Sequence, residues 1–139
     1  MTAYVRTDAR SIEAGLKYLI LGAVASASVL YGIAMLYSQI GHTRYDELTL
    51  HLMTHRPTPA VLLGMLLIIS GLGFKIAMVP FHLWVPDVYE GAPTPVTAFL
   101  AVGSKTAGFA ALLRLLLTTL QPLHAHWAWL LAVLSAATM

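Results

Sequence analysis

A long apolar run without any charged residue, from Tyr18 to Tyr37, sets the first limit on how this chain can fold. A helix needs about 20 apolar residues to cross a bilayer, and tyrosine at both ends of the run suits the membrane interface. Of the 139 residues, 58% are hydrophobic and only 10% are charged. Soluble domains carry about 25% charged residues, so the sequence predicts an α-helical membrane protein.

Four apolar stretches predict membrane spans at about residues 12–38, 60–85, 95–120 and 126–139. The last stretch is too short to complete a crossing, and we interpret the chain as an internal piece of a longer protein. The second contains Pro80, and a proline inside a helix breaks or kinks it. The expected fold is therefore all-α: a polytopic transmembrane helix bundle with one proline-broken helix, forming a single transmembrane region over residues 1–139.

Two further features concern how the spans pack and connect. Ser28 and Gly32 form a small-xxx-small step in the first span, which predicts close packing against another helix. Residues 38–59, which include three of the six histidines, are expected to form a polar connection between the first two spans.

The composition argues against several classes of site. Without cysteine, the chain can supply no disulfide, Fe–S cluster or thiolate zinc site. The histidines lack metal-ligand spacing with supporting acids, so we expect no metal site. Lysine and arginine are scattered and the net charge is only +2, which argues against nucleic acid as a partner. No glycine-rich phosphate-binding pattern is present, so we expect no nucleotide cofactor in this chain.

Lys75 is the strongest candidate for function. It stands inside the second apolar stretch, far from Ala60 on one side and Asp87 on the other. A charge at mid-bilayer costs about 2.5 kcal/mol or more, so such a residue usually faces a bundle interior or a hydrated cavity. The alternative, a lysine that reaches the headgroups from a helix end, fits this position poorly.

Pro80 follows Lys75 by five residues and is expected to free the carbonyl of Ile76. Freed carbonyls and half-helix ends at membrane depth line cavities and bind ions. The carbonyl end of a half-helix favours the charged amine, while burial favours the neutral one. A lysine between these influences can exchange a proton, although the proline could also serve only to shape packing.

Lys105 is a second lysine in the middle of an apolar stretch, the third one. Two lysines on neighbouring helices predict a hydrated proton relay, in which charging one discourages charging the other. The alternative is a lysine paired with an acid for assembly. Lys17 precedes the first apolar run and is interpreted as a membrane-edge anchor or as an end of the relay; Glu13 is placed to form an i,i+4 pair with it.

Three further residues near the break are candidates of lower rank. His82 could pass a proton, since its reference pKa is near 6.5, or could simply satisfy a freed backbone group. Asp87 and Glu90 are expected in the loop after the break. There they are interpreted as solvated loop acids in preference to catalytic ones.

The segment GLGFKIAMVPFHLWVPDVYEGAPTPV gives the chain a recognisable signature. It closely resembles the subunit N family among the antiporter-like membrane subunits of proton-translocating NADH-quinone oxidoreductase, respiratory complex I. The resemblance continues through SIEAGLKYLILGAVASASVLYGIAMLY and FLAVGSKTAGFAALLRLL, covering roughly residues 10–120. Sister subunits and Mrp-type cation/proton antiporters share the lysine–Pro–His–Trp–Pro-Asp pattern, but usually continue with Ala-His where this chain has PDVYEGAP.

The resemblance implies a membrane-arm subunit that translocates protons while the complex passes electrons from NADH to quinone. It assigns Lys75 to the essential lysine of the broken helix, Lys105 to the relay lysine of the next helix and Lys17 to the lysine that begins the preceding helix. The chain would cover about helices 6–9 of the family in a bacterial inner membrane, among other membrane subunits and lipid. NADH, FMN, Fe–S clusters and quinone would be bound by other subunits. An Mrp-type antiporter subunit and a non-catalytic membrane scaffold are the alternatives.

Overall fold

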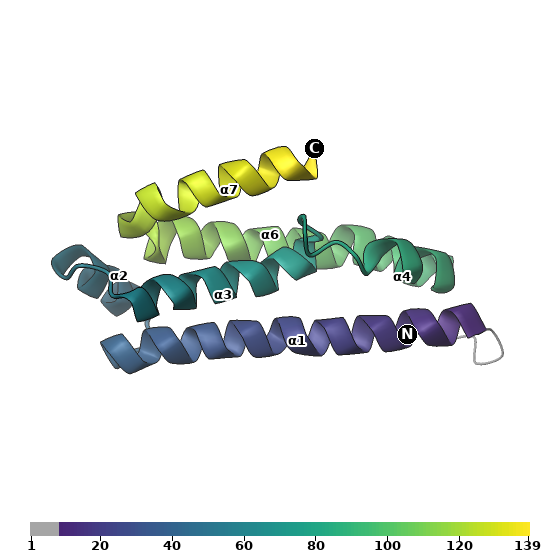
Figure 1. The fold of residues 1–139 in the computed structure, drawn as a ribbon, viewed down its shortest axis with the longest axis horizontal. Coiled ribbons are helices and arrows are strands. Elements are labelled where there is room, and N and C mark those ends of the chain that lie inside the picture. Colours follow the sequence, from purple (N-terminus) through teal and green to yellow (C-terminus); the bar gives the residue numbers. More distant parts are fainter. Residues whose placement is uncertain (1–8) are drawn as a thin grey trace.

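The computed structural model describes residues 9–139, and every regular element in that part of the chain is helical (Figure 1). Three of its helical segments are long and apolar enough to cross a membrane: Ser11–Ile40, Pro59–Ile76 and Thr94–Thr119. The predicted all-α, polytopic membrane fold is confirmed.

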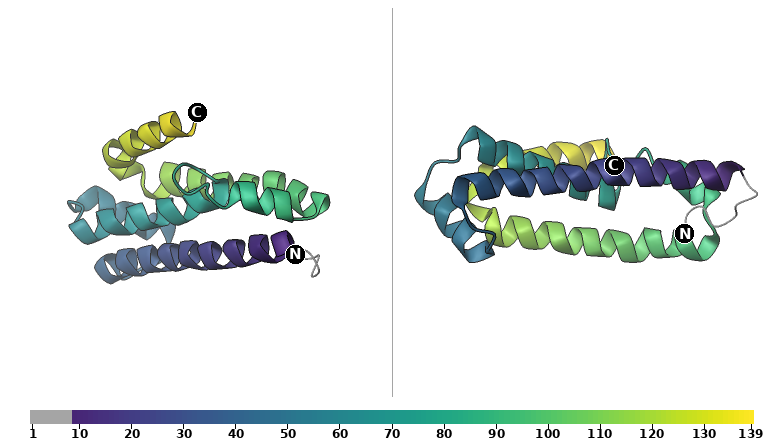
Figure 2. Two further views of the ribbon diagram at one scale, coloured as in Figure 1. Left: turned by 45° about the vertical axis from the view of Figure 1, so that its right-hand side comes forward. Right: turned by 90° about the horizontal axis from the view of Figure 1, so that it is seen from below.

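The helices of the described chain follow one another through short turns. They are α1 (Ala9–Ile40), α2 (Tyr45–Thr54), α3 (Pro59–Ile76), α4 (Val85–Gly91), α5 (Thr94–Phe99), the π-helical η1 (Leu100–Ser104), α6 (Lys105–Arg114), the π-helical η2 (Leu115–Thr119), the 3-10 helix η3 (Gln121–Leu123) and α7 (His124–Thr138). Segments α5 to η2 form one continuous rod. Helix α3 lies between α1 and α6, and successive long helices run in opposite directions (Figures 1 and 2).

Small residues bring α1 and α3 into backbone contact. A Cβ atom placed on Gly32 would lie 2.7 Å from the carbonyl oxygen of Gly64, far inside any normal contact. One turn away, the Ser28 hydroxyl donates to the carbonyl of Leu67 at 3.0 Å and lies 3.0 Å from the Ser70 hydroxyl. The predicted close packing at Ser28 and Gly32 is therefore confirmed, with α3 as the partner helix.

The second span breaks earlier than its proline predicts. Helix α3 begins with Pro59 in the first turn and ends at Ile76, whereas the expected span reached residue 85. Ala77 adopts a left-handed conformation with φ 60°. Met78 N donates to Gly73 O at 2.9 Å, and Ala77 N donates to the next carbonyl at 3.2 Å. This is a Schellman motif, which closes a helix without any proline, so Pro80 lies in the turn beyond the break.

Trp84 anchors the chain where it leaves this turn. Its side chain is 2% exposed, and its indole Nε1 donates to the carbonyl of Phe74 at 3.0 Å. The indole also packs against the rings of Phe74 and Tyr18, at 5.3 Å and 5.2 Å between centroids. A short helix, α4, then begins at Val85 and contacts α1. Asp87 and Glu90 consequently lie on this helix, and the expectation that they occupy a loop is wrong.

The expected polar connection, residues 38–59, also contains a helix. Helix α2 buries Leu48 and Leu52 on one side and packs against η2 and η3. Before it, Arg44 donates two hydrogen bonds to Asp46, which lowers the pKa of that carboxyl. The guanidinium of Arg114 lies over the Tyr45 ring, 5.4 Å from its centroid, so a cation–π contact joins the third span to α2.

Candidate functional site

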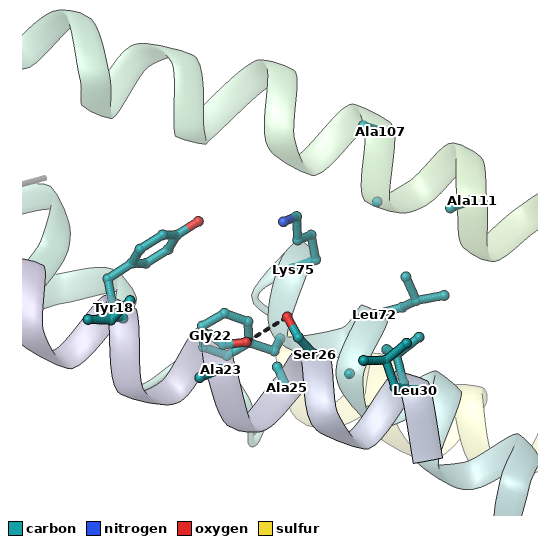
Figure 3. Close-up of a pocket in the computed structure, with 15 residues that line it drawn as sticks. Tyr18, Gly22, Ala23, Ala25, Ser26, Leu30, Leu72, Lys75, Ala107 and Ala111 are labelled. Carbon is teal, nitrogen blue, oxygen red and sulfur yellow. Dashed lines mark hydrogen bonds between the residues drawn. The ribbon is translucent and has the colours of Figure 1, made fainter. Parts of the chain in front are cut away.

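Lys75 reaches an open-sided cavity of about 770 Å³ between α1, α3 and α6 (Figure 3). On α1 the lining runs from Tyr18 to Leu30, which is the middle of the Ser11–Ile40 span. The lysine thus lies near the centre of the apolar layer that the spans define, even though it belongs to the last turn of its own helix. The break in the second span places a helix end, with Lys75 on it, at membrane depth.

The cavity is lined mainly by small and apolar residues. Its polar side chains are Lys75, Tyr18 and Ser26. The Ser26 hydroxyl donates to Gly22 O at 2.8 Å within α1, whereas the Tyr18 hydroxyl and the Lys75 amine point toward one another across the space (Figure 3). Among the residues that the structure describes, Lys75 is exposed to this cavity and Lys105 is half-buried.

Lys105 lies on the helix that closes the other side. It is the first residue of α6, directly after the π-helical turn η1. Gly108, one turn on, lets α6 approach α3, since a Cβ atom there would lie 2.7 Å from Ile76 Cγ2 and 3.5 Å from Lys75 Cβ. The Lys105 Nζ lies 5.6 Å from the centroid of the Tyr89 ring. Lys75 and Lys105 therefore lie on helices that pack together, with Lys105 about one turn before the contact at Gly108.

Lys17 is held by two carboxylates. Its Nζ lies 2.8 Å from Glu13 Oε1, which is the predicted i,i+4 pair, and 2.8 Å from Asp87 Oδ2 on α4. The second ion pair was not expected from the sequence. It places Lys17 in contact with the segment that follows the helix break, directly before Tyr18, where the cavity lining on α1 begins.

His82 lies in the turn between α3 and α4, two residues after Pro80. Its Nδ1 atom is buried and forms no hydrogen bond within the part of the chain that the structure describes. The peptide bond before Pro80 is cis. Glu90 is exposed on α4 and lines a small polar cavity together with Asp87 and Glu13. Asp87 thus contacts Lys17, with Glu90 on the same small cavity, and none of the three lower-ranked candidates lines the Lys75 cavity.

Among residues 9–139, no group of three or more His, Asp or Glu side chains is arranged to hold a metal ion. The sequence has no cysteine. The titratable groups in and beside this cavity are the lysine amines, the Tyr18 hydroxyl and the two carboxylates that contact Lys17.

A model of the family described as NADH:quinone oxidoreductase/Mrp antiporter, transmembrane, matches residues 1–139. The chain belongs to this family. It is 50% identical over 141 residues to NADH-quinone oxidoreductase subunit N of Heliobacterium modesticaldum and 48% identical over 139 residues to that of Moorella thermoacetica. Each match covers 100% of this chain but 29% of the relative, so the chain spans less than a third of the relatives' length. The resemblance to subunit N is confirmed.

Two solved structures share the antiporter-family fold. Respiratory complex I from Thermus thermophilus contains a chain that is 44% identical with a TM-score of 0.69, matching 81% of this chain and 24% of that one. The membrane-bound sulfane sulfur reductase, an archaeal respiratory membrane complex, gives 32% identity and a TM-score of 0.74 over 84% of this chain and 23% of its own. Both structures are multi-subunit respiratory membrane complexes.

Three aromatic residues of this antiporter-family site were not identified from the sequence. Tyr18 was interpreted only as an interface residue, yet its hydroxyl faces Lys75. Tyr89 contacts Lys105, and Trp84 fixes the carbonyl that precedes Lys75. Trp84 left a signal as part of the shared lysine–Pro–His–Trp–Pro-Asp pattern, and Tyr89 as part of PDVYEGAP, although neither motif shows what these side chains contact. The contacts of the two tyrosines depend on how separate helices meet.

Proposed function

We propose that this chain is part of a proton-translocating membrane-arm subunit of NADH:quinone oxidoreductase. One observation carries the proposal: Lys75, at a helix end in the middle of the membrane-spanning bundle, faces a cavity of about 770 Å³ beside the helix that carries Lys105. A charged amine at that depth is energetically costly, so its presence there favours a functional role. The 46–50% identity to subunit N over the full chain supports the same conclusion.

In this proposal the three lysines exchange protons along a hydrated path. Lys75 is the central group, since its ammonium faces the cavity and lies at the carbonyl end of α3, which favours positive charge. Lys105 lies on the packed neighbour, so a charge on one lysine disfavours a charge on the other. Lys17 with its carboxylates Glu13 and Asp87 forms the end of the path. His82, beside Pro80 in the turn, is a further candidate for proton transfer.

The rest of the enzyme lies outside this chain. NADH, FMN, Fe–S clusters and quinone would be bound by other subunits, and redox energy released there would change the charge states of the lysines. The partners are the other membrane subunits of the complex and the lipid of a bacterial inner membrane. The chain by itself would not catalyse NADH oxidation.

The deciding experiment replaces Lys75 by Ala in the full-length subunit within its complex. We expect the complex to assemble and proton pumping by inverted membrane vesicles to fall at least ten-fold, because the central proton carrier is gone. Arg56→Ala is the matched control, since it removes an exposed cation from the connection between spans. Normal assembly with normal pumping in the Lys75 variant would reduce the lysines to a scaffold role.

The family description also includes Mrp antiporters, and this favours one second candidate: a cation/proton antiporter subunit without a redox partner. The same vesicles separate the two candidates. Proton uptake that starts on addition of NADH supports the oxidoreductase. Proton movement that starts only on addition of a sodium gradient supports the antiporter.

A further inference from the structure

Tyr89 has two features that the lysine path above does not use. Its hydroxyl oxygen is buried and forms no hydrogen bond within the described residues. Its ring lies next to Lys105, with Nζ 5.6 Å from the ring centroid. The face of an aromatic ring attracts a cation within about 6 Å, and a neutral amine lacks that attraction. The ring therefore holds a charged Lys105 side chain more strongly than a neutral one.

The helix that carries Tyr89 also touches the surroundings of the other two lysines. Asp87, two residues earlier on α4, pairs with Lys17 at 2.8 Å. Trp84, the residue before α4, meets the Tyr89 ring edge-on at 6.1 Å and donates to the carbonyl of Phe74, the neighbour of Lys75. Helix α4 and the residue directly before it thus contact the surroundings of all three lysines.

We propose that Tyr89 is a positioning residue for the relay, and that helix α4 couples the charge of Lys105 to the Lys17–Asp87 ion pair. The inference rests on the proposed function. When Lys105 gives up its proton, its attraction to the ring ends and α4 loses one of its charged contacts. The other charged contact of α4, the Lys17–Asp87 ion pair, then changes its geometry. Proton loss at Lys105 therefore alters the surroundings of Lys17.

The test varies the charge distribution of the ring and leaves its shape alone. In the full-length subunit within its complex, Tyr89 is replaced by Phe and then by phenylalanine carrying one, two or three fluorines, which progressively weaken the negative ring face. Tyr89→Phe should retain pumping, since the hydroxyl forms no hydrogen bond with any of residues 9–139. Pumping should then fall stepwise with fluorination, by about two- to five-fold in total.

Phe109 provides the matched control. It lies on α6 one turn after Lys105 and is 50% exposed, and the same fluorinated series there should leave pumping unchanged. A flat series at position 89 in fully assembled complex overturns the inference. So does a loss of pumping in Tyr89→Leu that fluorination fails to reproduce, since the ring would then act only through its shape.

The outcome is separable from that of the proposed function. If Lys75→Ala abolishes pumping and the fluorinated series is flat, the relay remains and the role of Tyr89 is wrong. If Lys75→Ala pumps normally, both proposals fail together.

Discussion

The Nζ atom of Lys17 lies 2.8 Å from Oδ2 of Asp87, although 70 residues separate them in the sequence. The pair joins α1 to α4 across the end of the bundle, and both side chains are partly exposed, at 41% and 45%. Exposed ion pairs contribute little to stability. The Lys17–Asp87 pair therefore adds little to the stability of the fold, and its geometry can change when the charge of a neighbouring group changes.

Asp87→Asn should lower proton pumping modestly, by less than about five-fold, and leave assembly intact. The amide keeps the size of the side chain but loses the charge that attracts Lys17. The measurement is the initial rate of proton uptake by inverted vesicles, normalised to the amount of assembled complex.

Glu13→Gln is the control for this change. It removes the other carboxylate that lies 2.8 Å from Lys17, but Glu13 belongs to the same helix as the lysine. We expect a smaller effect, because no contact between helices is altered. An equal or larger loss in the Glu13 variant would argue that charge near Lys17 matters and the connection to α4 does not.

Trp84→Phe should destabilise the protein by about 1–3 kcal/mol and also reduce pumping. The change removes a buried hydrogen bond, worth about 0.5–1.5 kcal/mol, and leaves space beside the rings of Phe74 and Tyr18. Thermal unfolding of the purified full-length protein in detergent measures the first effect. Trp129→Phe, at a position that is 75% exposed, should change the unfolding free energy by less than about 0.5 kcal/mol.

The sequence predicted the membrane class and the small-residue contact because both follow from local pattern. A run such as Tyr18–Tyr37 specifies a spanning helix by length and composition alone. Small residues at Ser28 and Gly32 specify a close contact, although only the structure shows that the partner is α3. Lys75 could be selected as a candidate for a similar reason, since a charge in an apolar run is visible without any knowledge of its neighbours.

The position of the helix break could not be predicted, because it depends on a conformation rather than a residue type. Glycine usually occupies the left-handed end of a helix, and here Ala77 occupies it. Pro80 was the visible signal and indicated the break three residues too late. The Lys17–Asp87 and Lys105–Tyr89 contacts join residues on different helices, and one sequence carries no direct record of such pairs.

Ala77→Gly should raise the free energy of unfolding by about 0.5–1 kcal/mol. Glycine avoids the cost of about 1–2 kcal/mol that a side chain pays at φ 60°, and the greater freedom of the unfolded chain offsets part of the gain. Ala110→Gly, the same change inside α6, should instead destabilise by about 1 kcal/mol. Thermal unfolding of both variants should show shifts of opposite sign, and a loss of stability at both positions would contradict the left-handed conformation.

Gly32→Ala should destabilise the protein by about 1–3 kcal/mol, because its methyl group would lie 2.7 Å from the Gly64 carbonyl and the two helices would have to separate. Gly22→Ala, ten residues earlier on α1, should have the opposite effect. Its methyl group would meet Phe74 Cε1 at 3.8 Å, an ordinary contact, while alanine favours the helix by about 0.5–1 kcal/mol. Unfolding of the full-length variants in detergent measures both changes. If the two variants unfold with equal stability, α1 and α3 are not in backbone contact. The cavity that Lys75 faces would then not be bounded by α1.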